Sequence, residues 1–277
     1  MRAALLQMTS GIDPADNARV LTDAIARAAS EGAAMLFTPE MSGLLDRDRT
    51  RAAGSIVGED EDRVLAAVRE GAARAGLWVH LGSLAVRQGD RYANRGFVID
   101  ASGAIRARYD KIHLFDVDLP PSRKMAGESW RESAAFAPGK AAVVVDTPAG
   151  RLGLSICYDL RFPDLYRALS DAGATVLTVP AAFTRPTGAA HWQVLLRARA
   201  IEAGCFVVAA AQVGEHADGR ATYGHSLGID PWGEVMLDMA ETAGLGFVEI
   251  DPERLAEVRA RIPALRHRRA IPAVTLA

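Results

Sequence analysis

The residue in the sequence that most clearly could act as a nucleophile is the cysteine at position 157. Residues 152–156 alternate apolar side chains with glycine and serine, which indicates a buried strand, and Cys157 follows where that run stops. Pro163 and a helical pattern come next. A thiol at such a turn is held on rigid backbone at a sheet edge, where open α/β sheets bind ligands. A nearby helix N-terminus or cation would favour the reactive thiolate, whereas the alternative interpretation is an inert core cysteine.

Two further polar residues, Glu40 and Lys111, also stand where apolar runs end. A carboxylate can take the proton of a thiol that attacks a carbonyl carbon. A lysine ammonium beside a backbone N–H can hold the negative oxygen of the tetrahedral intermediate. If Glu40, Lys111 and Cys157 meet in space, they suffice to hydrolyse an amide without a metal or a cofactor.

Each of these residues also has an ordinary structural interpretation. Glu40 could cap a helix, Lys111 could be a surface charge and Cys157 could belong to the core. A cysteine–histidine pair is a further alternative, because it is another common arrangement for nucleophilic catalysis. Three histidines are candidate bases for such a pair: His113, His191 and His225.

The elements that would position these residues alternate between strands and helices. From apolar runs and turn residues we expect strands over 3–8, 34–37, 77–86, 94–100, 105–109, 143–145, 152–157, 175–179, 206–211, 226–229 and 246–250. Helical spacing predicts helices over 17–31, 61–75, 163–172, 191–203 and 252–262. Loops are expected over 120–130, covering the site, and over 184–190, and a turn at 231–233 joins the strands on either side.

The order of the elements indicates a mixed α/β protein with sheets covered by helices. No linker or repeat divides the chain, so we expect one domain over residues 1–262. Residues 263–277 form a tail that is first basic and then apolar. Its apolar part cannot bury itself alone, and we expect it to pack across a two-fold interface with a second copy.

Composition and charge argue against several classes of function. The net charge of −2 provides no basic field for nucleic acid or an anionic membrane surface. No apolar run reaches the length of a membrane span, and the first residues have no leader pattern. Two cysteines in 277 residues do not make a disulfide framework, and Cys205 is expected in the core. We therefore expect a cytoplasmic protein.

Three stretches, taken together and in order, resemble the nitrilase superfamily of carbon–nitrogen hydrolases. They are Phe37-Thr38-Pro39-Glu40, residues 109–114 (Tyr-Asp-Lys-Ile-His-Leu) and residues 153–163 (Gly-Leu-Ser-Ile-Cys-Tyr-Asp-Leu-Arg-Phe-Pro). The resemblance implies a four-layer α-β-β-α sandwich with two sheets face to face. It also implies a small-molecule amide substrate, no metal or cofactor, and a homodimer or higher homo-oligomer.

The same resemblance implies a role for each residue of the site. Glu40 would be the general base, Lys111 the oxyanion stabiliser and proton donor, and Cys157 the nucleophile that forms a thioester acyl-enzyme. The backbone N–H of Tyr158 would complete the oxyanion hole. A second family glutamate, which orients the lysine and the substrate, would fall on Glu132, although Glu128 lies close to it in the sequence.

Two residues are candidates for binding the substrate. Arg161 has a guanidinium that can grip a carboxylate through two parallel hydrogen bonds. Its alternative role is an ion pair with a neighbouring aspartate that orders the turn. Thr187 is a second candidate for the pocket, with capping of a loop as its alternative role.

The residues after the nucleophile, Tyr158-Asp159, differ from the Trp-Glu of true nitrilases and resemble a branch of small amidases. Residues 187–202, 209–212, 223–226 and 231–233 resemble deaminated glutathione amidases and omega-amidases. The run 195–202 and the strand end 209–212 resemble the former more closely. Ala189 and Gln193 depart from the proline and glutamate usual there. The resemblance implies an amide of a 2-oxo acid, foremost deaminated glutathione. The alternatives are an omega-amidase acting on 2-oxoglutaramate or 2-oxosuccinamate, and a non-catalytic interaction module of the same fold.

Overall fold

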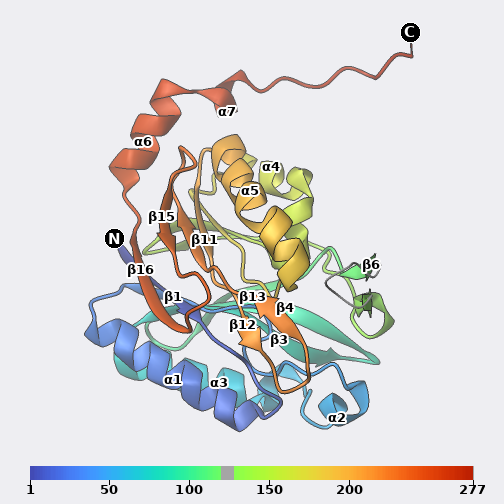
Figure 1. Ribbon diagram of the computed structural model, residues 1–277. Helices are drawn as coiled ribbons and strands as arrows, with labels where there is room; N and C mark the ends of the chain where they lie inside the picture. Colours follow the sequence, from blue (N-terminus) through green and yellow to red (C-terminus); the bar gives the residue numbers. More distant parts are fainter. Residues whose placement is uncertain (120–127, 277) are drawn as a thin grey trace.

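The chain folds into four layers, with two six-stranded sheets face to face between two layers of helices (Figure 1). The computed structural model describes residues 1–119 and 128–276. Strand order is β16-β1-β2-β3-β4-β5 in the first sheet and β15-β14-β11-β10-β9-β8 in the second. The expected α-β-β-α sandwich is therefore confirmed.

Each sheet has three parallel strands flanked by antiparallel ones. In the first sheet β1, β2 and β3 are parallel, and in the second β9, β10 and β11 are parallel. The first sheet contains β1 (Arg2–Gln7), β2 (Met35–Phe37), β3 (Trp78–Gln88), β4 (Arg91–Ile99), β5 (Ile105–Asp110) and β16 (Gly244–Glu249). The second contains β8 (Val144–Thr147), β9 (Gly150–Leu154), β10 (Val176–Thr178), β11 (Phe206–Ala209), β14 (Leu227–Ile229) and β15 (Val235–Asp238).

Helices cover the outer face of each sheet. Helices α1 (Pro14–Ser30) and α3 (Arg63–Ala75) lie on the first sheet, and α4 (Pro163–Asp171) and α5 (Arg185–Ala203) lie on the second (Figure 1). The remaining helices and 3₁₀ turns are α2 (Arg49–Ala53), α6 (Pro252–Arg261), α7 (Ala264–His267), η1 (Glu59–Glu61), η2 (Glu132–Ala134) and η3 (Cys157–Arg161). Two small antiparallel sheets pair β6 (Asp116–Leu119) with β7 (Glu128–Arg131) and β12 (Val213–Glu215) with β13 (Ala221–Tyr223).

Local sequence explains where α1 and α3 begin and end. Asp13 accepts a hydrogen bond from the N–H of Ala15, and a proline opens α1, so that helix starts earlier than the apolar spacing alone indicates. Asp62 caps α3 in the same way, and Gly76 ends it with φ at +63°. Both helices turn apolar faces onto the first sheet.

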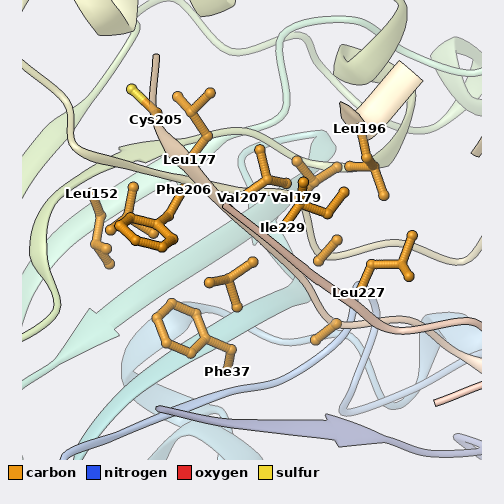
Figure 2. Packing of buried hydrophobic residues seen from close by; sticks show 14 of the residues in the cluster. Phe37, Leu152, Leu177, Val179, Leu196, Cys205, Phe206, Val207, Leu227 and Ile229 are labelled. Carbon is orange, nitrogen blue, oxygen red and sulfur yellow. The ribbon is translucent and has the colours of Figure 1, made fainter. Parts of the chain in front are cut away.

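The core between the sheets is apolar and continuous. Phe37 from β2 belongs to the same buried cluster as Leu152, Leu177 and Val207 from the second sheet (Figure 2). Each such side chain stabilises the fold by about 1.5–3 kcal/mol relative to exposure. The two sheets are therefore fixed against each other. As a result, residues that follow strands of both sheets at the same end keep fixed positions relative to one another.

Three sequence expectations were wrong in detail. Residues 184–190 are not a loop, because α5 begins at Arg185. Gly188 stays helical there because it packs on Tyr223, whose ring would collide with any Cβ at that position. Part of the expected loop 120–130 is strand β7, and residues 120–127 lie outside the described part. The turn at 231–233 leads into β15, not directly into β16.

The C-terminal segment leaves the body of the protein after α7 (Figure 1). Its apolar residues Ile271, Val274 and Leu276 are 78%, 90% and 100% exposed. Within residues 1–119 and 128–276, the helices are all too short or too polar to cross a bilayer.

Candidate active site

Glu40, Lys111 and Cys157 come from three chain segments that end near one another. Glu40 follows β2 by three residues, Lys111 follows β5 directly, and Cys157 follows β9 by three residues. Because β2 and β9 lie in facing sheets, their carboxyl ends deliver these side chains to a common place. All three, together with Glu132, line a cavity of about 540 Å³.

Lys111 lies at the centre of this group and is 2% exposed. Its Nζ donates to Oε1 of Glu40 and to Oε2 of Glu132, each at 2.9 Å. Burial alone would lower the pKa of Lys111, but the two carboxylates outweigh it and raise that pKa well above its usual value. The ammonium has three donors, and these two bonds leave one for a ligand.

Glu40 is held in place at both carboxylate oxygens and at its backbone carbonyl. Its Oε1 also accepts from Nδ2 of Asn94 at 2.9 Å, and its Oε2 accepts from the backbone N–H of Ala182 at 3.0 Å. Gln212 donates to its backbone carbonyl at 2.9 Å. Burial acts to raise the pKa of Glu40, but the charge and hydrogen bonds of Lys111 prevail and lower it. The carboxylate is therefore ionised and able to accept a proton.

Glu132 is the second glutamate beside the lysine. Its Oε1 accepts from Asn94 at 3.0 Å, and its Oε2 accepts from the backbone N–H of Phe115 at 2.7 Å. Asn94 thus bridges both glutamates, a role that the sequence did not indicate, because an asparagine in a strand carries no chemical signature. The side chain of Glu128 lies outside the described residues.

Cys157 occupies a strained turn. Its φ is +50°, in the left-handed region that side chains other than glycine rarely adopt, and its backbone N–H donates to the carbonyl of Pro180 at 2.9 Å. Burial, followed by the negative charge of Glu40, raises the pKa of the thiol well above its usual value. The resting thiol is therefore protonated and lies beside an ionised carboxylate.

The turn is fixed by Asp159, which is fully buried. Its Oδ2 accepts from the backbone N–H of Ile156 at 2.9 Å and from the hydroxyl of Tyr109 at 2.7 Å. Across the described residues, no acceptor is present for the backbone N–H of Tyr158. That N–H is the next donor after Cys157 and remains available at the site.

The three histidines have partners elsewhere. His113 Nδ1 lies 2.7 Å from Oδ1 of Asp159, and its ring stacks on Phe162. His191 lies against Arg161, and His225 against Asp238. None of the three lines the cavity. The geometry therefore favours the carboxylate, not a histidine, as the neighbour of the thiol.

The two candidate binding residues are placed differently. Thr187 lines the cavity, with its hydroxyl 2.8 Å from that of Thr184. Arg161 does not line it, and its guanidinium carbon lies 5.7 Å and 5.6 Å from the ring centroids of Tyr158 and Phe183, which do. Arg161 forms no ion pair with any carboxylate in residues 1–119 and 128–276, so its alternative role in ordering the turn is not seen.

Comparison with known proteins places this site in a family. Residues 2–260 match the carbon-nitrogen hydrolase family. The chain is 39% identical over 271 residues to a deaminated glutathione amidase of Yersinia enterocolitica, covering 97% of this chain and 93% of that protein.

Solved structures agree with the sequence match. The C. elegans NitFhit protein has a TM-score of 0.88 at 38% identity, over 97% of this chain, which spans 65% of the NitFhit chain. A mutant of the amidase from Nesterenkonia sp. AN1 has a TM-score of 0.79 at 28% identity, over 95% of this chain and 98% of that one, and carries acrylamide on its active-site cysteine. The chain belongs to the carbon-nitrogen hydrolase family, within the nitrilase superfamily, and is an amidase that hydrolyses carbon–nitrogen bonds other than peptide bonds.

Proposed function

We propose that the protein hydrolyses the amide bond of deaminated glutathione, with Cys157 as nucleophile, Glu40 as general base and Lys111 as oxyanion stabiliser. The observation that carries the proposal is that the Cys157 thiol, the Glu40 carboxylate and the buried Lys111 ammonium line one cavity, with Lys111 donating to Glu40 at 2.9 Å. This arrangement supplies a base, a nucleophile and a cation in one cavity, as acyl transfer requires.

The first half-reaction forms a thioester. Cys157 Sγ attacks the amide carbon while its proton passes to Glu40, so the nucleophile becomes a thiolate only as the new bond forms. The carbonyl oxygen becomes an oxyanion and accepts from the third donor of Lys111 and from the backbone N–H of Tyr158. Collapse breaks the carbon–nitrogen bond, and the proton held by Glu40 passes to the leaving amine.

The second half-reaction restores the enzyme. A water molecule gives a proton to Glu40 and attacks the thioester carbon, and the oxyanion again forms between Lys111 and Tyr158. Collapse expels Cys157, which takes back the proton, and releases a carboxylic acid. Glu132 and Asn94 do not exchange protons in this scheme. Glu132 positions Lys111 by accepting from its Nζ, and Asn94 positions Glu40 by donating to its Oε1. Asn94 also donates to Glu132, so the two positioning residues are linked.

The relatives support the choice of substrate, because the similar protein of Yersinia enterocolitica is named for deaminated glutathione. A cavity of about 540 Å³ is in the range of small-molecule sites. Arg161 and Thr187 are proposed to bind the 2-oxo acid carboxylate at the acyl end, with Arg161 turning from its place over Tyr158 and Phe183 into the cavity. We also propose that the protein acts in the reducing cytoplasm, because Cys157 must remain a thiol to act as the nucleophile.

The test is a comparison of kcat/KM for deaminated glutathione and for 2-oxoglutaramate and 2-oxosuccinamate, with release of the oxo acid as the readout. We expect deaminated glutathione to be preferred by about 100-fold or more, since binding energy from remote parts of a substrate raises kcat/KM. Preference for the smaller amides would make the protein an omega-amidase. No hydrolysis of any amide, by wild type and Cys157→Ala alike, would leave only an interaction module.

The assembly is also part of the proposal. We propose that residues 1–262 form the catalytic domain and that residues 263–277 pack on a second copy in a homodimer or larger homo-oligomer. The exposed Ile271, Val274 and Leu276 support this, because such side chains gain from burial in a partner. Light scattering at micromolar concentration should give at least a dimer, and removal of residues 270–277 should weaken it.

A further inference from the structure

A second feature of the cavity is a group of positively charged side chains. Four arginines line the cavity: Arg47, Arg49, Arg131 and Arg220. Two of them are bonded to protein groups through their terminal nitrogens. Arg131 pairs with the carboxylate of Asp118 at 2.8 Å, and Arg49 donates to the backbone carbonyl of Arg131 at 2.6 Å.

The other two arginines are organised by one buried carboxylate. The side chain of Asp218 is fully buried. Its Oδ2 accepts from Nε of Arg220 at 2.7 Å and from the backbone N–H of Arg47 at 2.9 Å, and its Oδ1 accepts from the backbone N–H of Arg220 at 3.0 Å. Asp218 thus ties the chain at Arg47 to the chain at Arg220, although the two positions are far apart in sequence.

The two guanidinium groups share an aromatic ring. The guanidinium carbon of Arg47 lies 5.3 Å from a ring centroid of Trp130, and that of Arg220 lies 5.1 Å from one. Stacking of this kind fixes the plane of a guanidinium and leaves its edge free for hydrogen bonds. In the described part of the chain, Nε is the one side-chain nitrogen of Arg220 that donates to a protein group.

The carboxylates that line the cavity are already committed. Glu40 and Glu132 hold Lys111, and Asp46 pairs with Arg51 at 2.6 Å. Among the lining residues that the structure describes, no further carboxylate remains for Arg47 or for the two terminal nitrogens of Arg220. Burial lowers the pKa of Arg220, and the nearby charge of Arg47 contributes to that lowering. An anion bound by both guanidinium groups would favour their charged forms and so offset this lowering.

We propose that Arg47, Arg220 and Trp130 form a subsite for a second substrate carboxylate, the one carried by the leaving group. This inference rests on the proposed function. Deaminated glutathione has one carboxylate on its 2-oxo acid and another at the far end of the dipeptide that leaves. The amides 2-oxoglutaramate and 2-oxosuccinamate release ammonia and have no carboxylate on that side. The subsite therefore gives the enzyme a physical means of preferring the longer substrate.

The test uses three substrates: deaminated glutathione, the same compound with its C-terminal carboxylate converted to a primary amide, and 2-oxoglutaramate. For the wild type we expect the C-terminal amide to have a KM higher by roughly 10- to 100-fold, the size of a lost charge-assisted hydrogen bond pair. For Arg47→Gln we expect the same increase in KM for deaminated glutathione, little change in kcat, and no change for 2-oxoglutaramate.

Arg49→Gln is the matched control, because Arg49 lines the same cavity and carries the same charge but donates to a backbone carbonyl. If the positive charge of the cavity alone mattered, Arg47→Gln and Arg49→Gln would raise KM equally. If Arg47 belongs to a subsite, Arg49→Gln should change KM by less than about threefold. Arg220→Lys keeps the charge but loses the planar fork, and should raise KM for deaminated glutathione selectively. Because Arg47 is exposed, we expect Arg47→Gln to fold normally.

Two results would overturn the inference. One is a wild-type enzyme that hydrolyses deaminated glutathione and its C-terminal amide equally well. The other is an Arg47→Gln variant that loses activity on all three substrates in proportion. Both differ from failure of the proposed function, in which the wild type does not hydrolyse deaminated glutathione at all.

Discussion

The two cysteines of this protein share burial and a raised pKa but differ in their neighbours. Both thiols are free and buried. Burial raises the pKa of Cys205 to about 11 and that of Cys157 well above its usual value. At neutral pH both are therefore protonated, and neither has the lowered pKa that usually marks a reactive cysteine.

Their neighbours differ completely. Cys205 donates to the backbone carbonyls of Ala174 and Ala203 at 3.1 Å and 3.2 Å, and Arg259 lies 3.3 Å from its sulfur. Cys157 lies beside the carboxylate of Glu40 and lines a cavity. Cys157 has a carboxylate and a cavity beside it, whereas Cys205 is enclosed by backbone carbonyls, the guanidinium of Arg259 and apolar packing. We infer that the local base, not a standing thiolate, makes Cys157 reactive.

The sharpest test of this contrast is removal of each thiol. Cys157→Ala should lower kcat/KM by roughly 10⁴-fold or more, as loss of a nucleophile does in other hydrolases. In the native wild type, iodoacetamide should modify Cys157 with parallel loss of activity and leave Cys205 unmodified, as peptide mass spectrometry can measure. If Cys205 is modified first, or if activity survives full modification of Cys157, then Cys157 is not the reactive thiol.

The next effect in size comes from Glu40. Glu40→Gln should lower kcat/KM by roughly 10²- to 10⁴-fold, because the thiol loses its base. Glutamine also places an N–H₂ group against the N–H of Ala182 or against Lys111, so one donor loses its acceptor. With a buried ion pair broken, we expect a loss of about 3 kcal/mol in unfolding free energy, measured by urea denaturation at neutral pH.

The pH dependence follows from the same residue. The pKa of Glu40 is lowered below its ordinary 4.5 in the folded state. Its contribution to stability is therefore present above the unfolded pKa and is lost as pH falls through the folded pKa. The acid limb of kcat/KM should accordingly lie below about pH 4.5 in wild type. In Glu40→Gln, alkylation of Cys157 should instead rise about tenfold per pH unit through the neutral range, since solvent must then form the thiolate.

Glu40, Lys111 and Cys157 could be singled out in the sequence because each is a reactive residue type placed where an apolar run ends. That signal is local and does not show that the three residues meet, which only the resemblance to the nitrilase superfamily implied. The sheet pairing brings the three ends together. Asn94 and Arg220 carry no such signal. Asn94 is one polar residue in a strand, and Arg220 stands in a loop that meets Arg47 only through the tertiary fold. Their roles depend on long-range packing, which no single stretch of sequence encodes.

The fold was predictable to a similar degree. Capped amphipathic helices such as α1 and α3 and the apolar strands β1 and β2 are set by short-range patterns, and they were found within a few residues. The start of α5 was not, because a glycine and a proline at its first turn indicate a loop unless the packing of Gly188 on Tyr223 is known. Tertiary contact overrides local preference there.

The smallest expected effect belongs to the second thiol. Cys205→Ala should leave kcat/KM unchanged within about twofold and lower the unfolding free energy by about 1 kcal/mol, because it removes one buried sulfur and leaves a small void. Arg259 keeps its bonds to the carbonyls of Gly204 and Ala174, so the helix that carries it should stay docked. Kinetics of this variant measures any effect on catalysis, and urea denaturation measures the effect on packing. A large loss of activity without loss of stability would mean that Cys205 acts on the site, and burial among carbonyls would then no longer distinguish a structural thiol from a catalytic one.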